Sequence, residues 1–427
     1  MKKQGRTMRK LLIAAATAAA FAPLAAQATV GYFSHGYGIK AQSMGGVGIA
    51  LPQDALAAAT NPAGMAWVGN RVDLGLGWFA PDRGAEIVNN GAGLNGTYDA
   101  NGTSSFLIPE FGYNRMLNPN LSLGVSVFGN GGMNTTYDSS PFKNFGGTSP
   151  AGVDLMQLFI APTMAWKSGN HSFGVALNLA YQRFKAEGLE PFTGFSGSPG
   201  NVTNQGYDSS TGYGVRIGWT GQVSPTVTLG ATYQTKTTMG KLDKYKGLFA
   251  NEGEFDIPEN YGAGIAWKAS KGLTLAADVQ VINYNDVAAV GNSANCLFAG
   301  ACMLGGPNGA GFGWQNTTVY KIGAMYELNP KVTLRGGFVT LKQPIPESQT
   351  FFNILAPGVV ENHLTLGATF QMSATGELTV SYMHAFESKV NGQNSIPPGF
   401  PPAGLGGGEA NLRMSQNALG VAYGWKY

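Results

Sequence analysis

The chain has 427 residues, and only 12% of them are charged, whereas soluble globular proteins carry about 25%. Aromatic residues make up 11% and glycine contributes 63 residues, a composition that argues against an ordinary soluble enzyme. The formal net charge of +3 depends on five basic residues near the N-terminus. Without these five, 22 of the 27 basic residues are left against 24 acidic residues, so the net charge becomes −2. A basic net charge therefore gives no support for a nucleic-acid partner.

Residues 1–28 have the features of a secretory signal peptide. A basic start is followed by the apolar run LLIAAATAAAFAPLAA and by the small-residue triplet Ala26-Gln27-Ala28, which predicts cleavage before Thr29. The rest of the sequence contains no other uninterrupted apolar stretch of the roughly 18 residues that a spanning helix needs. An exported chain with little charge, much glycine and many aromatics is typical of a transmembrane β-barrel in a bacterial outer membrane.

Residues 29–70 precede the first alternating segment and are predicted to form a plug, or hatch, inside the barrel. Residues 54–60 can make two helical turns, which end before Pro62 because a residue ahead of proline avoids the α region. The turn Asn61-Pro62-Ala63-Gly64 follows. A wide barrel needs such a segment, since its interior exceeds what side chains alone can fill. We expect the gating residues of the plug to be Phe33, Asn61, Pro62, Ala63 and Gly64.

Residues 71–427 are predicted to form a barrel of fourteen antiparallel strands. The segments alternate apolar residues with small or polar ones, as in residues 172–184, and the connections between them are alternately long and short. The predicted strands are 71–80, 104–113, 121–128, 155–166, 172–184, 213–221, 226–237, 260–267, 273–282, 318–328, 332–341, 363–370, 378–386 and 417–427.

Aromatic residues mark one end of this barrel. In the lipid-facing register they recur where every second strand ends, as expected for a girdle at a membrane interface: Tyr113, Trp166, Trp219, Trp267, Tyr326, Phe370, Trp425 and Tyr427. The final strand ends in an aromatic residue at the C-terminus itself. It resembles the signal by which outer-membrane barrels are recognised by their assembly machinery, which we therefore expect as a partner.

Three features together resemble the FadL/TodX family of outer-membrane transporters for hydrophobic compounds. They are the glycine-rich N-terminal segment with Asn61-Pro62-Ala63-Gly64, the fourteen strands, and the stretch IAPTMAWK at 160–167. The resemblance implies that a hatch blocks the lumen, that substrate enters between the outer loops, and that it leaves sideways at a kinked third strand. No motif aligns the ligand residues of the family, so none is carried over.

The residues around the third strand, 121–128, support such a lateral opening. Pro109 and Pro162 lie inside the two neighbouring strands, and proline cannot donate a hydrogen bond to the ladder. Gly124 and Gly129 permit the third strand to bend. The alternative is an ordinary β-bulge.

Cations facing the lumen are candidates for binding a fatty-acid carboxylate, because a buried carboxylate needs a partner. Strand parity places Arg216, Lys321 and Arg335 inside, together with Asp73 and Asp278. The alternative is that these charges pair with one another and brace the barrel.

Two predicted outer loops, 129–154 and 185–212, carry apolar residues. They form either a first capture groove or the packing of the loops over the barrel mouth; the residues are Met133, Tyr137, Phe142, Phe145, Leu189, Phe192 and Phe195. Cys296 and Cys302 share one outer loop, and in an oxidising compartment they are expected to form a disulfide. No histidine lies near them in sequence, which argues against a metal site.

The sequence therefore predicts a monomeric transporter that moves hydrophobic molecules passively, opens when ligand binds, and releases them into outer-membrane lipid. Long-chain fatty acids are the expected substrates, and aromatic hydrocarbons are the alternative. The plug and the sparse lumen charge disfavour an unselective diffusion porin. Neither a Ser-His-acid set nor a cofactor motif is evident, so we expect no enzymatic activity.

Overall fold

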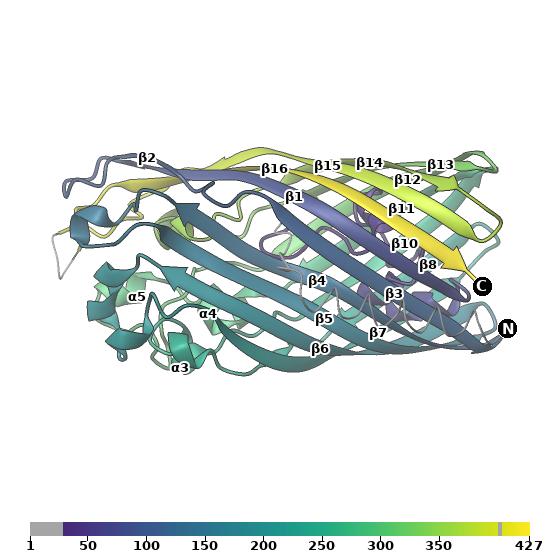
Figure 1. Ribbon diagram of the computed structural model, residues 1–427, viewed down its shortest axis with the longest axis horizontal. Coiled ribbons are helices and arrows are strands. Elements are labelled where there is room, and N and C mark those ends of the chain that lie inside the picture. Colours follow the sequence, from purple (N-terminus) through teal and green to yellow (C-terminus); the bar gives the residue numbers. More distant parts are fainter. Residues whose placement is uncertain (1–28, 400–403) are drawn as a thin grey trace.

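The computed structural model describes residues 29–399 and 404–427, so the predicted signal peptide, residues 1–28, lies outside the described residues. Over this part of the chain, fourteen long antiparallel strands form one sheet, which closes because β16 pairs with β1 (Figure 1). Closure gives each long strand a neighbour on both sides. The all-β fold class and the number of strands are confirmed.

The long strands follow one another around the barrel in chain order. They are β1 (Arg71–Val88), β3 (Phe106–Asn118), β4 (Leu121–Tyr137), β5 (Ala151–Ser168), β6 (His171–Glu187), β7 (Asp208–Gln222), β8 (Val227–Gln234), β10 (Asn260–Ser270), β11 (Leu273–Ile282), β12 (Thr317–Asn329), β13 (Val332–Leu341), β14 (Asn362–Gln371), β15 (Gly376–Val390) and β16 (Glu409–Lys426). The short β2 (Gly96–Asp99) and β9 (Thr238–Met239) pair with β1 and β7.

Along the strands of the barrel wall, exposed apolar side chains alternate with buried small or polar ones. On β6, Phe173, Leu177 and Leu179 are exposed on the outside, while Ala176 and Asn178 between them are buried. The aromatic girdle is present on the outer surface, where Trp166, Trp267, Trp425 and others of the set remain exposed. Such alternation places apolar side chains against acyl chains and small or polar ones against the interior.

No helix within residues 29–399 and 404–427 is long and apolar enough to cross a membrane. The helices are single turns. They are α2 (Ile39–Gln42), α3 (Ala250–Gly253), α4 (Ala288–Gly291) and α5 (Asn295–Phe298), with the 3₁₀ turns η1 (Ala57–Ala59), η2 (Pro62–Ala66), η3 (Lys143–Phe145), η4 (Glu190–Phe195), η5 (Pro199–Asn201), η6 (Asp243–Tyr245), η7 (Tyr284–Asp286), η8 (Glu347–Gln349) and η9 (Phe352–Ile354).

The long connections lie at the end of the barrel remote from the C-terminus (Figure 1). Several strands extend further toward this end than predicted: β1 reaches Val88, β4 reaches Tyr137 and β15 reaches Val390, whereas the predictions ended at 80, 128 and 386. These extensions lack the apolar alternation that identifies a lipid-facing strand. As a correction, Met133 and Tyr137 therefore lie on β4 and not in a loop.

Candidate functional site

The hatch, defined here as residues 29–70, lies inside the barrel and is almost wholly buried (Figure 1). It packs directly against wall glycines that face the lumen, at positions where an added Cβ would collide with hatch atoms. We call this set the glycine seat: Gly112 meets Ala55, Gly124 meets Met65, Gly174 meets Pro62, Gly218 meets Asn61, Gly230 and Gly264 meet Ile49, Gly323 and Gly337 meet Met44, Gly367 meets Ser43, and Gly420 meets Ile39. Part of the high glycine content is thus explained by close approach of two backbones.

Asn61 and Pro62 tie the hatch to β6 and β7. The Asn61 Oδ1 atom accepts a hydrogen bond from the Ala63 N–H (3.1 Å) and caps η2, in which Pro62 takes the first position. Its Nδ2 donates to the carbonyls of Ile49 (2.7 Å) and Trp219 (3.0 Å). The two helical turns expected at residues 54–60 are replaced by the shorter η1. The wall holds this segment instead, because the Ala55 N–H donates to the Asp73 carboxylate and the Ala55 carbonyl accepts from the Ser126 hydroxyl.

The other two residues of the motif are also fixed. The Ala63 carbonyl accepts from the Ser172 hydroxyl (3.0 Å), and a Cβ at Gly64 would lie 2.7 Å from Pro52 Cβ. Trp67 extends the same anchor, since its Nε1 donates to the hydroxyls of Ser172 (2.8 Å) and Thr220 (3.1 Å). Residues 61–67 are therefore a fixed joint between hatch and wall.

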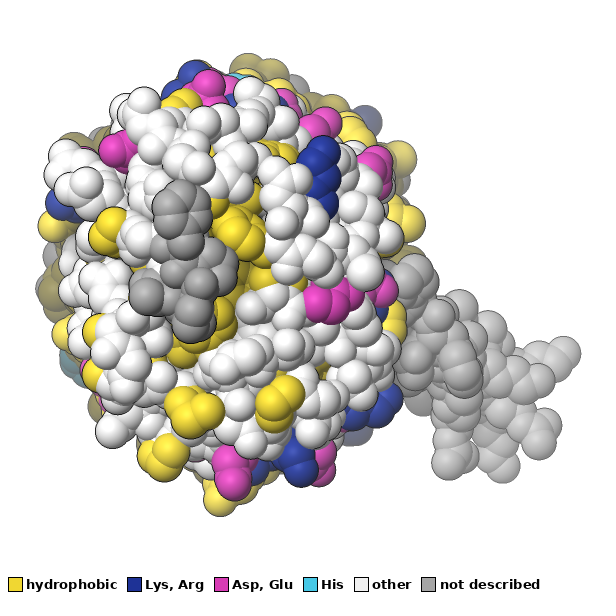
Figure 2. All heavy atoms as spheres, turned by 90° about the vertical axis from the view of Figure 1, so that its left-hand side faces the viewer, with side chains coloured by type: hydrophobic (Ala, Val, Ile, Leu, Met, Phe, Trp, Pro, Cys, Tyr) yellow, Lys and Arg dark blue, Asp and Glu magenta, His cyan; other side chains and the backbone are white. Residues whose placement is uncertain are grey.

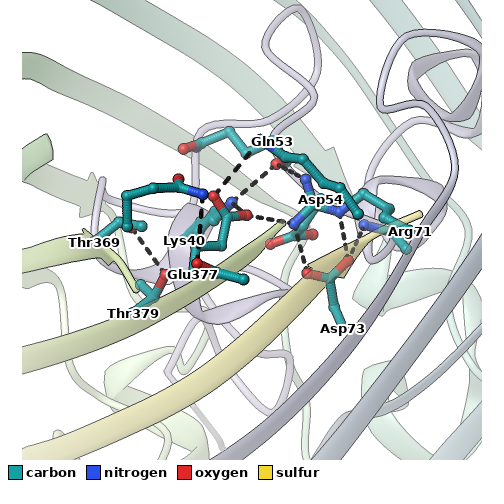
Figure 3. Close-up of polar contacts among 12 residues, drawn as sticks. Lys40, Gln53, Asp54, Arg71, Asp73, Thr369, Glu377 and Thr379 are labelled. Atoms are coloured by element: carbon teal, nitrogen blue, oxygen red, sulfur yellow. Dashed lines mark hydrogen bonds and ion pairs between the residues drawn. The ribbon is translucent and has the colours of Figure 1, made fainter. Parts of the chain in front are cut away.

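A buried charge network joins the hatch to the wall near the start of β1 (Figure 3). Arg71 Nη2 contacts Asp73 Oδ1 and Glu377 Oε1, each at 2.6 Å, and Lys40 of the hatch pairs with the same Glu377 carboxylate. Burial, followed by the nearby Asp73, raises the pKa of the Asp54 carboxyl. This network matches the bracing alternative that the sequence left open for the lumen charges.

Arg335 belongs to the same bracing system. Its Nε donates to Gln53 Oε1 of the hatch (2.8 Å) and its Nη1 donates to Thr369 Oγ1 (2.6 Å). Lys321 instead donates to Gln280 Oε1 (3.0 Å) beside Asp278, whose carboxylate accepts from the Gly48 N–H (2.8 Å) of the hatch. Lys321 and Arg335 thus take part in polar contacts that hold the hatch and the wall together.

Arg216 is bonded as well, because its Nη1 donates to the Thr60 carbonyl of the hatch and its Nη2 donates to Gln234 Oε1, but its Nε belongs to a row of donor groups without partners in the described chain. Arg216 on β7 and Asn260 on β10 are both cross-strand partners of Gln234 on β8, and all three side chains are buried toward the lumen. We call them the donor row. Within the described chain, Arg216 Nε, Gln234 Nε2 and Asn260 Nδ2 each lack a hydrogen-bond partner. Cross-strand neighbours have Cβ atoms about 5 Å apart, so these N–H groups line one short stretch of wall.

An apolar cavity lies among the long connections at the barrel mouth. It is small, with a volume of about 50 Å³, and its thirteen lining residues are all apolar or glycine. Hydrophobic side chains also gather in a recess near the centre of this end of the molecule (Figure 2). The lining residues are Val153, Phe184, Leu189, Phe192, Leu248, Phe249, Ala289, Leu304, Ala310, Gly311, Phe312, Phe352 and Leu355.

The predicted loop residues surround this cavity rather than forming an open groove. Phe192 lines it, and Phe142 packs edge-on against Phe192 with ring centroids 5.1 Å apart. Phe195 packs against Phe298 (5.2 Å). Tyr137 is fully buried and donates to the Ile354 carbonyl (2.7 Å), and Met133 is buried below it. A disulfide joins Cys296 to Cys302 in the same group of connections.

Aromatic rings continue from this cavity down to the hatch. The rings follow one another in the order Phe184, Phe249, Phe255, Tyr32 and Phe33. The distances between the centroids of neighbouring rings in this order are 4.7, 5.0, 6.1 and 5.3 Å. We call these five rings the aromatic column. Because neighbouring rings are in contact, the column is closed in this structure, and a molecule that follows it must displace them.

One backbone hydrogen bond connects the segment just beyond Gln234 to the segment that carries Phe255 of the column. Thr237, three residues beyond Gln234, donates through its N–H to the Ile257 carbonyl (2.9 Å), two residues from Phe255. Arg216 Nη1 donates to the Thr60 carbonyl of the hatch (2.9 Å), which places the row against the hatch. The neutral members of the row were missed from the sequence, although strand parity would have placed Gln234 inside as it did Arg216.

The β3–β4 ladder is incomplete. It ends at the pair Phe111↔Val127, whereas β3 stays paired to β1 as far as Phe106, and β4 stays paired to β5 as far as Tyr137, with a bulge at Gly129. Residues 106–110 of β3 and 128–133 of β4 therefore face each other without ladder pairs in the part of the chain described. We call this gap the lateral window.

Of the residues predicted for a lateral opening, Pro109 and Gly129 lie on the window itself. Pro162, opposite Val125, sits where the β5–β6 ladder is interrupted between Ile160 and Thr163. Gly124 lies below the window and belongs to the glycine seat. The first residues of the hatch cover the inner side, since the Ser34 N–H donates to the Asn130 carbonyl (3.1 Å) and the Gly132 N–H donates to the Tyr32 carbonyl (2.9 Å).

Comparison with known proteins agrees with this architecture. The family model described as outer membrane protein transport protein (OMPP1/FadL/TodX) matches residues 18–427. The fold is similar to the Pseudomonas putida toluene transporter TodX (19% identity, 92% of this chain and 99% of that chain, TM-score 0.66). It is similar to a Pseudomonas aeruginosa FadL homologue (16%, 93% and 99%, 0.70) and to the Ralstonia pickettii toluene transporter TbuX (19%, 92% and 99%, 0.62). No curated protein gave a significant sequence match.

Proposed function

Because the chain belongs to the OMPP1/FadL/TodX family, and is thus an outer-membrane barrel that transports hydrophobic compounds, we propose that its substrates are long-chain fatty acids. The observation that carries this proposal is the donor row, whose three buried N–H groups lack partners in the described chain. Uptake is passive, ligand binding opens the route, and release occurs sideways through the lateral window.

The donor row favours an amphiphile over a neutral hydrocarbon. Burying an N–H group without an acceptor costs about 1–3 kcal/mol, and a carboxylate satisfies several such donors at once. The aromatic column offers the apolar surface that an acyl chain needs. An aromatic hydrocarbon would occupy the column and leave Arg216 Nε, Gln234 Nε2 and Asn260 Nδ2 unpaired, so it remains the second candidate.

Ligand-dependent opening follows from the contacts of the hatch. A chain that enters the column displaces Tyr32 and Phe33, and these residues adjoin the segment that covers the inner side of the window. The rest of the hatch is held by the glycine seat and by the charge network, so we expect a local movement of residues 29–37. A diffusion porin would require an open lumen, which the seated hatch does not provide.

Arg216→Met should weaken fatty-acid binding by roughly 10- to 100-fold, the effect of losing a hydrogen bond to a charged group. Uptake of toluene or a medium-length alkane should change little. The measurement is binding of radiolabelled palmitate to purified protein, with hydrocarbon uptake by whole cells in parallel. Arg335→Met is the matched control, because it removes another buried lumen guanidinium, whose Nε is already bonded to Gln53. Equal loss for both substrate classes in Arg216→Met would contradict the proposal.

A further inference from the structure

Arg83 crosses the top of the lateral window. It belongs to β1, its side chain is 1% exposed, and its guanidinium reaches past β3 to β4. Nε donates to the Asn134 carbonyl (2.6 Å), and Nη2 donates to Asn134 Oδ1 (2.6 Å) and to the Thr103 carbonyl (2.7 Å). Nη1 donates to the Pro81 carbonyl (3.2 Å). One side chain therefore links β1, the segment before β3, and β4, directly above the missing β3–β4 ladder.

The acceptors around this cation are all neutral. Within residues 29–399 and 404–427, no carboxylate forms an ion pair with Arg83, and the adjacent Asp82 is bonded to Asn101 Nδ2 (2.7 Å) and to Arg413 (3.1 Å). A buried guanidinium without a counter-ion is costly, and a neutral side chain could fill the same space. What an arginine supplies is a rigid fork of donors that can hold several backbone carbonyls together.

Two backbone hydrogen bonds also join β4 to the segment before β3 at the upper end of the lateral window. The Thr136 N–H donates to the Ala100 carbonyl (3.0 Å), and the Gly102 N–H donates to the Thr136 carbonyl (3.0 Å). Below them, the Phe106 ring lies under the guanidinium, 5.8 Å from it. The window is thus bounded above by Arg83 and Thr136 and below by the pair Phe111↔Val127.

We propose that Arg83 is a clasp that sets the upper limit of the lateral window and thereby restricts how bulky a released molecule can be. The inference rests on the proposed lateral exit. A slender acyl chain passes below the clasp, between residues 106–110 and 128–133, without disturbing it. A branched or ring-bearing molecule needs a taller opening, which requires the two hydrogen bonds from the buried guanidinium to Asn134 on β4 to break together.

The test compares two fatty acids of different girth, palmitate and a palmitate-length acid that carries pyrene at its ω-end, in cells that express the full-length protein. Arg83→Met should raise the ratio of pyrenyl to palmitate uptake by about 10-fold, since several charge-assisted hydrogen bonds are lost. Palmitate uptake itself should stay within about 3-fold of the parent. Asn134→Val removes one of the four acceptors and should raise the ratio by a smaller factor. Arg83→Lys keeps the charge but loses the fork, so it should behave like Arg83→Met.

A purely structural role for Arg83 would lower uptake of both acids together and leave their ratio unchanged, and that result would overturn the clasp. Barrel folding is checked by the heat-dependent shift of the band in gel electrophoresis. If Arg83→Met fails to fold, Asn134→Val decides: a raised ratio supports the clasp, and an unchanged ratio overturns it. Failure of lateral exit itself is distinguishable, because palmitate release would then continue when the window is covalently bridged.

Discussion

Covalent bridging of the lateral window should stop release of substrate. Leu107 on β3 is 51% exposed, and Gly129 on β4 lies on the opposite edge of the gap in the β3–β4 ladder. In a variant carrying Leu107→Cys and Gly129→Cys, a short bis-maleimide should reduce palmitate uptake to the level of cells that lack the protein. The physical reason is that residues 106–110 and 128–133 have no ladder pairs to hold the gap shut or open, so a covalent link across it closes the proposed exit.

The control for this experiment is a bridge between strands that are already paired. Leu177 on β6 and Val215 on β7 are cross-strand partners, so joining cysteines at these positions adds a link without closing any gap. The native disulfide between Cys296 and Cys302 does not react with maleimide. Uptake that persists with the β3–β4 bridge in place, confirmed by mass spectrometry, would show that substrate leaves by another path.

Placing a side chain in the glycine seat should break the seal. A Cβ at Gly218 would overlap Asn61 Oδ1, and the neighbouring Pro62 Cδ would lie only 2.9 Å away. Overpacking of this kind typically costs about 1–3 kcal/mol. For Gly218→Val we expect the hatch to relieve this cost by withdrawing residues 61–67 from β6 and β7, which would raise ion conductance in planar bilayers and admit large antibiotics into cells.

The matched control is Gly336→Val. Gly336 also lies within a strand, on β13, but its nearest neighbours are Leu366 Cδ2 at 3.5 Å and the Thr365 carbonyl at 3.7 Å, which leaves room for a side chain. We expect this variant to conduct like the parent. If Gly218→Val folds and also conducts like the parent, the hatch is not sealed by close contact with the wall.

The sequence predicted the barrel well because lipid imposes a two-residue period on the wall. The limits 273–282 and 332–341 coincide with β11 and β13. The outer ends of β1 and β4 were missed, because beyond the membrane both faces of a strand are free to be polar and the period disappears. The hatch was predicted from its position and its lack of alternation, but its local structure depends on contacts with the wall, and the expected turns at 54–60 shorten to η1.

The candidate site was only partly predictable. Strand parity placed Arg216 and Arg335 inside alike, yet the structure separates them: Arg335 is bonded to Gln53, 282 residues away in sequence, whereas Arg216 keeps an unpaired Nε within the described chain. Pro109 pointed to a gap, but the extent of the window depends on the β3–β4 register. The role of Gly218 was invisible without the position of Asn61.

The most direct test of the proposed route uses a photoreactive long-chain fatty acid in outer-membrane vesicles, with labelled residues mapped by mass spectrometry. We expect labels on the mouth cavity, on the aromatic column, beside Arg216, and on both edges of the lateral window at residues 106–110 and 128–133. Labelling of the far side of the hatch, around Gln53 and Trp67, with none at the window edges would contradict lateral release and would indicate passage through the hatch.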